Sequence, residues 1–221
     1  MKFICTKLAR TIWVVDMNHL NVEGRSLLDL FQGIGKRYRF GRYPQGLTDY
    51  NKEGALEFNS GTFLKGANAD LRVGLTIYNN GLAADSLSST DNSEAFLQDI
   101  AAWAAKKHSF NFDSALIKRK SHISQIEVQF ENELPLVNPK LNFLPEKLYS
   151  QIVPFDGTLM EYRFGGISSW TEDLQKERSL NSFRLERKWN TPFETNIYFS
   201  TAPMTTQQHV SILNEIEAAL K

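Results

Sequence analysis

Apolar and polar side chains alternate strictly along residues 71–78, with Leu71, Val73, Leu75 and Ile77 on one side of the pattern. A period of two is typical of a β-strand that buries one face. Asn79-Asn80-Gly81 follows, and because such residues tolerate positive φ, the chain is expected to reverse there into an antiparallel strand at 82–87. This hairpin argues against a purely parallel sheet.

An amphipathic helix is predicted directly after the hairpin. Thr90 or Asp91 can cap its start, and Glu94 lies three residues beyond Asp91, which is the spacing of a capping box. The cationic residues at 106–108 suit its carboxyl end because they complement the helix dipole. Its apolar residues recur at helical spacing and form one face: Phe96, Leu97, Ile100, Ala101, Trp103 and Ala104.

The same alternation recurs in the second half of the chain, although the sequence shows no fixed-period repeat. In the third strand that it predicts, Trp189 would belong to the buried face. Thr205 and Gln208 form a capping box for a final helix. The predicted strands are 124–130, 160–164, 183–189 and 195–200.

Toward the amino terminus, a strand is expected at 11–15 and a helix over 27–38, weakened by its two glycines. Residues 56–64 would form a short hairpin about Ser60-Gly61. Four of the seven prolines mark a connection that contains a short helix at 145–152. These four are Pro135, Pro139, Pro145 and Pro154.

Together these elements predict a single α+β domain over residues 1–221. Its mostly antiparallel sheet would have about six to eight strands, with three or four helices packed on it. The proline-rich connection at 131–156 is the one candidate lobe boundary. A chain of 221 residues buries enough surface for a stable core without disulfides or metals.

Charge and cysteine content limit the partners and the compartment that the sequence predicts. With 25 basic and 25 acidic residues, the chain has no net field that would attract nucleic acid or anionic membrane. The single cysteine, Cys5, has no partner in the chain, which favours a reducing, cytoplasmic compartment. The apolar run at 12–15 is far too short for a signal peptide or a membrane span.

No common catalytic signature is present, and no cofactor or metal site is predicted. The four histidines are scattered, and nucleophile elbows, phosphate loops and dinucleotide fingerprints are absent. One arrangement resembles metal-dependent nucleases of the restriction type: Asp156, with Glu186 and Lys188 thirty residues later on one strand face. There the carboxylates would hold magnesium and the lysine would help to activate water. The competing interpretation is a solvated strand face that carries mixed charges.

Basic and aromatic residues interleave at 36–43, a mixture that suits single-stranded nucleic acid. A second basic cluster at 118–120 would extend such a groove. The alternative is a helix that ends in cations and leads into a loop anchored by its rings. The candidate binding residues in this segment are Arg37, Tyr38, Arg39, Arg42 and Tyr43.

Trp170 follows a loop rich in glycine and serine and lacks the periodic context that would bury it, so it is our first candidate for an exposed anchor. The alternative is that its ring folds back over the edge of the sheet and has a structural role. Arg187 stands between apolar positions, so it either marks the end of its strand or pairs with a buried acid.

We therefore expect a non-enzymatic, cytoplasmic protein-binding module. It would neutralise a toxin, as an immunity protein does, or form a subunit of a larger assembly, with Trp170 and residues 37–43 as contact surfaces. Nucleic-acid binding through residues 36–43 is the first alternative, and a metal-dependent nuclease is the second. No membrane partner is expected.

Overall fold

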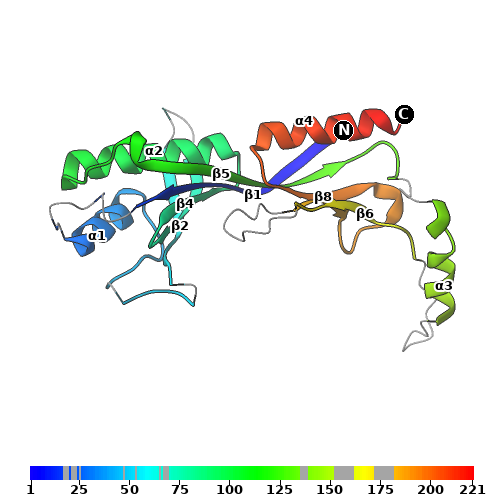
Figure 1. Cartoon of the computed structure of the whole chain (residues 1–221), viewed down its shortest axis with the longest axis horizontal. Helices are drawn as coiled ribbons and strands as arrows, with labels where there is room; N and C mark the ends of the chain where they lie inside the picture. Colours follow the sequence, from blue (N-terminus) through cyan, green and yellow to red (C-terminus); the bar gives the residue numbers. More distant parts are fainter. Residues whose placement is uncertain are drawn as a thin grey trace.

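The computed structural model describes the whole chain except residues 17–19, 21–23, 25, 47, 53, 65, 67–69, 135–138, 152–161 and 172–181. The described strands form one antiparallel sheet of eight, in the order β2-β3-β4-β1-β5-β8-β7-β6 (Figure 1). With four α-helices beside this sheet, the expected α+β fold is confirmed.

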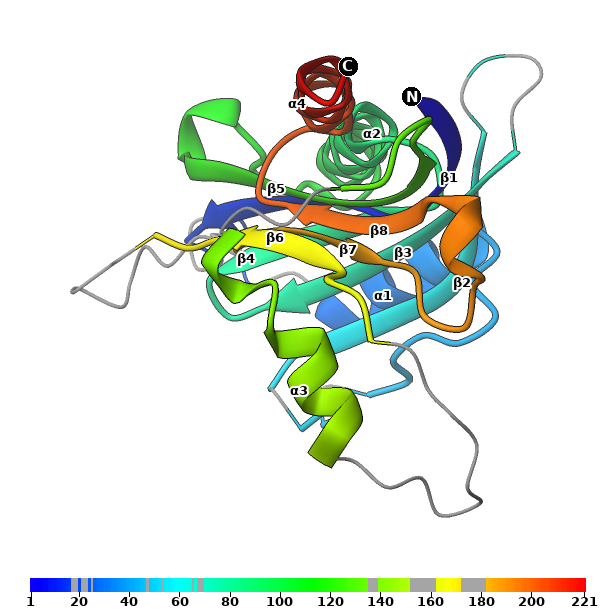
Figure 2. The same ribbon diagram turned by 90° about the vertical axis from the view of Figure 1, so that its right-hand side faces the viewer.

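The strands are β1 (Lys2–Val15), β2 (Leu56–Leu64), β3 (Asp70–Tyr78), β4 (Gly81–Ser86), β5 (Ile117–Gln129), β6 (Gly166–Ser169), β7 (Phe183–Arg187) and β8 (Ile197–Ala202). The helices are α1 (Leu27–Arg37), α2 (Thr90–His108), α3 (Leu144–Gln151) and α4 (Thr206–Ala219). Short 3-10 turns lie at Ser114–Leu116, Pro139–Leu141 and Phe193–Thr195. Helices α2 and α4 lie on the same side of the sheet, whereas α3 projects away from it (Figures 1 and 2).

The order of elements repeats. Strand, helix, three strands and helix follow one another in the amino-terminal unit, β1 to α2, and again in the carboxyl-terminal unit, β5 to α4. In the sheet, β2-β3-β4-β1 is matched by β6-β7-β8-β5 in the reverse direction. The two units are therefore related by a pseudo-two-fold axis between β1 and β5. The candidate lobe boundary at 131–156 lies inside the second unit.

Two pairs of residues mark this axis. Ala9 of β1 lies opposite Ser124 of β5. Nearby, Thr90 and Thr206 begin α2 and α4, and each backbone N–H donates to the other's Oγ1, at 3.1 and 3.0 Å. The first N–H groups of a helix have no partner within it. Each helix start thus satisfies one such group of the other, and both residues are buried.

The fourth residue of each helix ties it to the central strands. In α2, Ser93 donates to the carbonyl of Ala9 at 2.6 Å. In α4, the same place belongs to His209, whose Nδ1 is 3.0 Å from Ser124 Oγ and whose Nε2 is 2.8 Å from Ser200 Oγ. Ser200 donates its own hydrogen to the carbonyl of Arg184, so it accepts from His209 Nε2–H. Burial lowers the pKa of His209 to about 4, which keeps the ring neutral.

Each unit has its own core. In the amino-terminal unit, α1 and α2 pack on one face of the sheet around a cluster of rings centred on Phe96, which has Tyr38 at 4.9 Å and Phe63 at 5.4 Å between centroids. In the carboxyl-terminal unit, Leu213 of α4 packs on a smaller core. The other buried members of that core are Ile126, Val128, Phe130, Leu134, Leu185 and Tyr198.

Most predicted elements are present, among them the 71–78 strand, the 27–38 helix and the capping box of Thr205 and Gln208. The hairpin predicted within 56–64 is wrong, because these residues form one continuous strand, β2. Ser60 adopts a φ of +60°, and the register shifts between Phe58 and Gly61. The apparent turn is thus a β-bulge, which bends a strand without reversing it.

Three further details differ from the sequence prediction. The cap of α2 is Ser89, whose side chain accepts from Asn92 N–H at 3.3 Å. The chain reverses at Asn79-Asn80, but neither residue adopts a positive φ. Glycine is needed at position 81 for another reason, because a side chain there would strike the carbonyl of Trp13. Of the strand predicted at 160–164, positions 160 and 161 lie outside the described residues and the rest is not a strand.

Candidate interaction surface

Two tryptophans of the carboxyl-terminal unit are exposed to solvent. Trp170, directly after β6, is 68% exposed, and Trp189, just beyond β7, is 92% exposed. The exposure expected for Trp170 is therefore present. The burial predicted for Trp189 is wrong, because β7 ends at Arg187 and the chain turns away through Asn190, whose φ is +57°.

The strands β6 and β7 fix where these two rings lie. They form the hairpin at one edge of the sheet, with Ser169 opposite Phe183 and Gly166 opposite Glu186. Trp170 continues from one end of this ladder and Trp189 from the other. A side chain at Gly166 would strike the carbonyl of Leu185, so glycine is required for the close approach of the strands.

Further apolar side chains are exposed on and beside α3. Phe143, which precedes the helix, is 59% exposed, and Tyr149 is 45% exposed. In its described side chains, α3 buries no residue, in agreement with its position away from the sheet (Figure 2). We call Phe143, Tyr149, Trp170 and Trp189 the carboxyl-terminal aromatic set.

The predicted binding segment 37–43 divides between core and surface. Tyr38 is only 3% exposed, and its hydroxyl donates to Asp99 Oδ2 at 2.6 Å. Burial and this hydrogen bond raise the pKa of Tyr38. Arg37 also pairs with Asp99, at 3.0 Å, and its guanidinium lies 5.3 Å from the centre of the Tyr38 ring. Both residues thus hold α1 against α2.

The rest of this segment runs beside the edge strand β2. Arg39 and Arg42 are exposed, and the backbone of Arg42 pairs with Asn59. The Tyr43 ring is half-buried and stacks on Phe58, with 6.4 Å between centroids. Arg39 and Arg42 therefore lie on the surface, as Arg37 also does, and the role of these residues in binding stays a prediction.

The second basic cluster, 118–120, lies at the start of β5, which is separated from β2 by three strands. At about 4.8 Å per strand, this separation is roughly 19 Å. Lys120 already pairs with Glu94, and its ammonium lies 5.1 Å from the centre of the Trp13 ring. The two clusters thus do not meet side by side.

The residues of the nuclease hypothesis are not shown together. Asp156 lies outside the described residues. Lys188 pairs with Glu127 Oε2 at 2.9 Å, and Phe199 stands between Glu186 and Glu127 in the strand register. Among the described residues, no group of three or more acidic, histidine or cysteine side chains is arranged to hold a metal ion.

Glu127 is a charged site that the sequence did not reveal. It is 5% exposed and pairs with Lys7 at 3.1 Å as well as with Lys188, while Cys5 Sγ lies 3.6 Å away. Burial alone would raise the pKa of Glu127, but the two lysines outweigh it and hold the pKa below its usual value. The group is an ion-pair network of one carboxylate and two ammonium groups that joins β1, β5 and the residue after β7.

The first alternative for Arg187 is confirmed, because Arg187 ends β7; the second is wrong, because the acid beside it is not buried. Its Nη1 lies 3.6 Å from Glu133, which is exposed, and its Nη2 donates to the carbonyl of Pro192. Its guanidinium also lies 5.6 Å from the centre of the Tyr198 ring. Arg187 thereby fastens the loop that follows Trp189.

Comparison with known proteins adds no relatives: no protein-family model matches the chain, and no curated sequence is similar to it. Within the described residues, no helix combines the length and the apolar character that crossing a membrane requires.

Proposed function

We propose that this protein is a protein-binding module and that the carboxyl-terminal aromatic set is its contact surface. The exposure of Trp170 and Trp189 at the two ends of one edge hairpin supports this proposal. A tryptophan buries roughly 150–250 Å² when it is covered, and tryptophan is enriched at binding hot spots. A partner that covered both rings would remove a large apolar area from water.

The sheet edge suggests how a partner would bind. In the described part of the chain, β6 pairs only with β7 and ends the sheet. The outer side of an edge strand offers unpaired backbone groups to an extended segment of another protein. Such a segment would lie along β6 between the two tryptophans. Toxin neutralisation and membership in a larger assembly are the two uses that we predict for this contact.

The test uses the full chain as bait in a nuclease-treated native lysate, with quantitative mass spectrometry of what is retained. Trp170→Ala and Trp189→Ala should each weaken retention of the same protein at least fivefold, a loss of about 1 kcal/mol or more. Phe3→Ala is the matched control, since Phe3 is also exposed, at 45%, but lies on β1. Both tryptophan variants should unfold at the wild-type temperature, because exposed side chains contribute little to stability.

Other outcomes would reject the proposal. Equal loss in Phe3→Ala would show non-specific adhesion. Retained nucleic acid with a steep salt dependence, lost in Arg39→Ala, would favour the nucleic-acid alternative. Magnesium-dependent cleavage that disappears in Glu186→Ala would favour the nuclease. For a confirmed partner, the mass of the purified complex separates a one-to-one inhibitor from a multi-chain assembly.

A further inference from the structure

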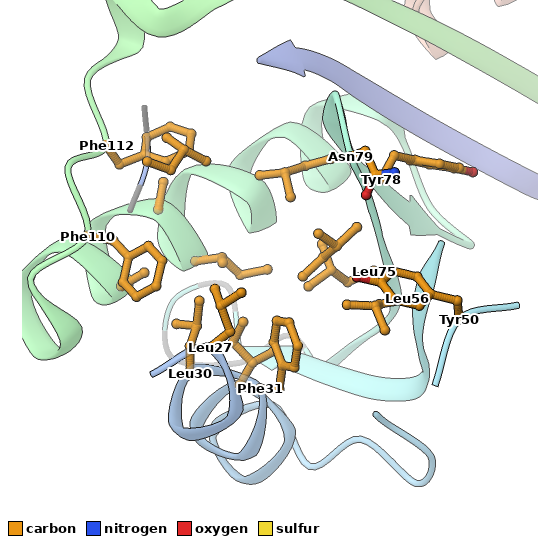
Figure 3. Close-up of a pocket in the computed structure, with 17 residues that line it drawn as sticks. Leu27, Leu30, Phe31, Tyr50, Leu56, Leu75, Tyr78, Asn79, Phe110 and Phe112 are labelled. Carbon is orange, nitrogen blue, oxygen red and sulfur yellow. The ribbon is translucent and has the colours of Figure 1, made fainter. Parts of the chain in front are cut away.

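A cavity of about 460 Å³ lies inside the amino-terminal unit, between α1, α2 and the sheet (Figure 3). Its walls include Leu30 and Phe31 of α1, Leu75 of β3 and Ala104 of α2. Protein interiors are close-packed, with few voids larger than a water molecule. At about 30 Å³ per water, this cavity has room for roughly fifteen. It is much larger than a packing defect.

The lining of the cavity is mainly apolar. Among the residues that the structure describes, no Asp, Glu, Lys or Arg lines the cavity, and almost all of this lining is aliphatic or aromatic. The polar lining groups are Tyr50, Tyr78 and Asn79, which lie together at one end of the cavity (Figure 3). Tyr50 and Asn79 are exposed, so this end is the opening to solvent. Among the described residues, none of these three side chains has a hydrogen-bond partner.

The walls are held apart by contacts at one end of α1. Tyr38, which caps α1, bonds to Asp99 of α2 and accepts from Thr62 N–H of β2 at 2.7 Å through its carbonyl. Gly33 lets this part of the helix approach Trp103 of α2 closely. The carboxyl end of α1 is thus fixed, while Leu27 and Leu30 at its other end line the open space. Collapse of α1 onto β3 would break these contacts.

We propose that this cavity binds one small, neutral, mainly hydrocarbon molecule whose single polar group lies at the opening and bonds to Asn79. Cavities of about 300–1,000 Å³ with apolar walls and few polar groups are typical of ligand sites. A charged group inside would have no counterion among the described lining residues, and burying it unpaired is costly. The volume and the single polar end limit the ligand to one molecule.

The test is a fluorescence titration of the full-length protein with N-phenyl-1-naphthylamine, a neutral apolar probe, followed by competition with decan-1-ol. One saturable site per chain is expected, and decan-1-ol should displace the probe. Ala104→Leu fills the cavity and should weaken probe binding at least tenfold. Ala102→Leu makes the same change on the same helix at an exposed position and should leave binding unchanged.

A second filling variant, Leu30→Trp, enters the space from α1 and covers the case in which Ala104→Leu does not fold. Asn79→Ala, at an exposed position, should weaken decan-1-ol binding more than probe binding. Uptake without saturation, or equal binding by wild type and both filling variants, would overturn the proposal. Trp189→Ala should bind the probe as wild type does, which separates this site from the proposed protein contact.

Discussion

The two units share one order of elements but use their aromatic residues in opposite ways. In the amino-terminal unit, α1 covers the sheet, and rings such as Phe96 and Phe58 are fully buried. In the carboxyl-terminal unit, the corresponding helix, α3, stands away from the sheet, and Trp170 and Trp189 are exposed. The same scaffold thus makes an enclosed apolar interior in one half and an exposed apolar surface in the other.

The difference depends on the first helix of each unit. Where α1 packs against α2, it closes the face of the sheet and creates an interior large enough to hold a cavity. Where α3 leaves the sheet, α4 is the one described helix that covers that half, and the core there is smaller. The strands and second helices carry the symmetric framework, so the first helices are the part that differs most.

The most damaging single change should be removal of the ring at the centre of the amino-terminal core. Phe96→Ala is expected to lower the free energy of unfolding by about 3–5 kcal/mol, because it leaves a cavity among packed rings. Leu213→Ala, fully buried in the carboxyl-terminal core, is the matched change and should cost about 2–5 kcal/mol. Urea denaturation measures both. A loss below 1 kcal/mol for Phe96→Ala would show that the ring cluster does not hold this unit together.

The pH dependence of stability should distinguish the attachment of α4 through His209 from that of α2 through Ser93. The pKa of His209 is about 4 in the folded protein, below its ordinary 6.5. Between these values the unfolded chain binds a proton that the folded chain does not, so stability falls as pH is lowered from 6.5 toward 4. The contribution between pH 7 and 4.5 is about 2–3 kcal/mol.

The measurement compares free energies of unfolding at pH 7 and pH 4.5. In His209→Gln, the change in the free energy of unfolding between pH 7 and pH 4.5 should be smaller by about 2–3 kcal/mol. Ser93→Ala, at the equivalent place in α2, should lower stability equally at both, because serine does not titrate in this range. His122, whose pKa burial also lowers, is present in every variant and cancels. An unchanged pH difference in His209→Gln would show that this ring is not the acid-sensitive group.

The smallest effect concerns the contact between the units. Thr90→Ala and Thr206→Ala each leave one buried N–H without its partner, at a cost of about 1–3 kcal/mol. Each substitution removes a different one of the two bonds, so the double variant should lose about the sum of the two single losses. Urea denaturation of the three variants measures these losses. Wild-type stability in both single variants would mean that the exchanged bonds do not join the units.

The local framework could be predicted from the sequence because its signals lie within a few residues of one another. Alternation predicted β3 and β5, the turn residues at 79–81 predicted β4, and the pair Thr205 and Gln208 predicted the start of α4. The errors arose where one local signal has two structural meanings. Ser60-Gly61 fits a turn or a bulge, and Trp189 continued an alternation beyond the end of its strand.

The candidate sites were harder to predict from the sequence, because they join distant parts of the chain. Tyr38 reaches Asp99 across 61 positions, and Lys188 reaches Glu127 across the same separation. No spacing rule connects such pairs before the fold is known. The two-fold relation was also hidden, since equivalent residues such as Ser93 and His209 perform the same attachment with different chemistry.

The pseudo-two-fold axis has a consequence for how this protein can change. In a symmetric homodimer, one gene encodes both halves, so every substitution appears twice. Here the positions related by the axis are encoded separately, and a substitution beside the cavity has no copy beside α4. The chain therefore keeps the geometry of a symmetric pair while each half remains free to acquire its own task.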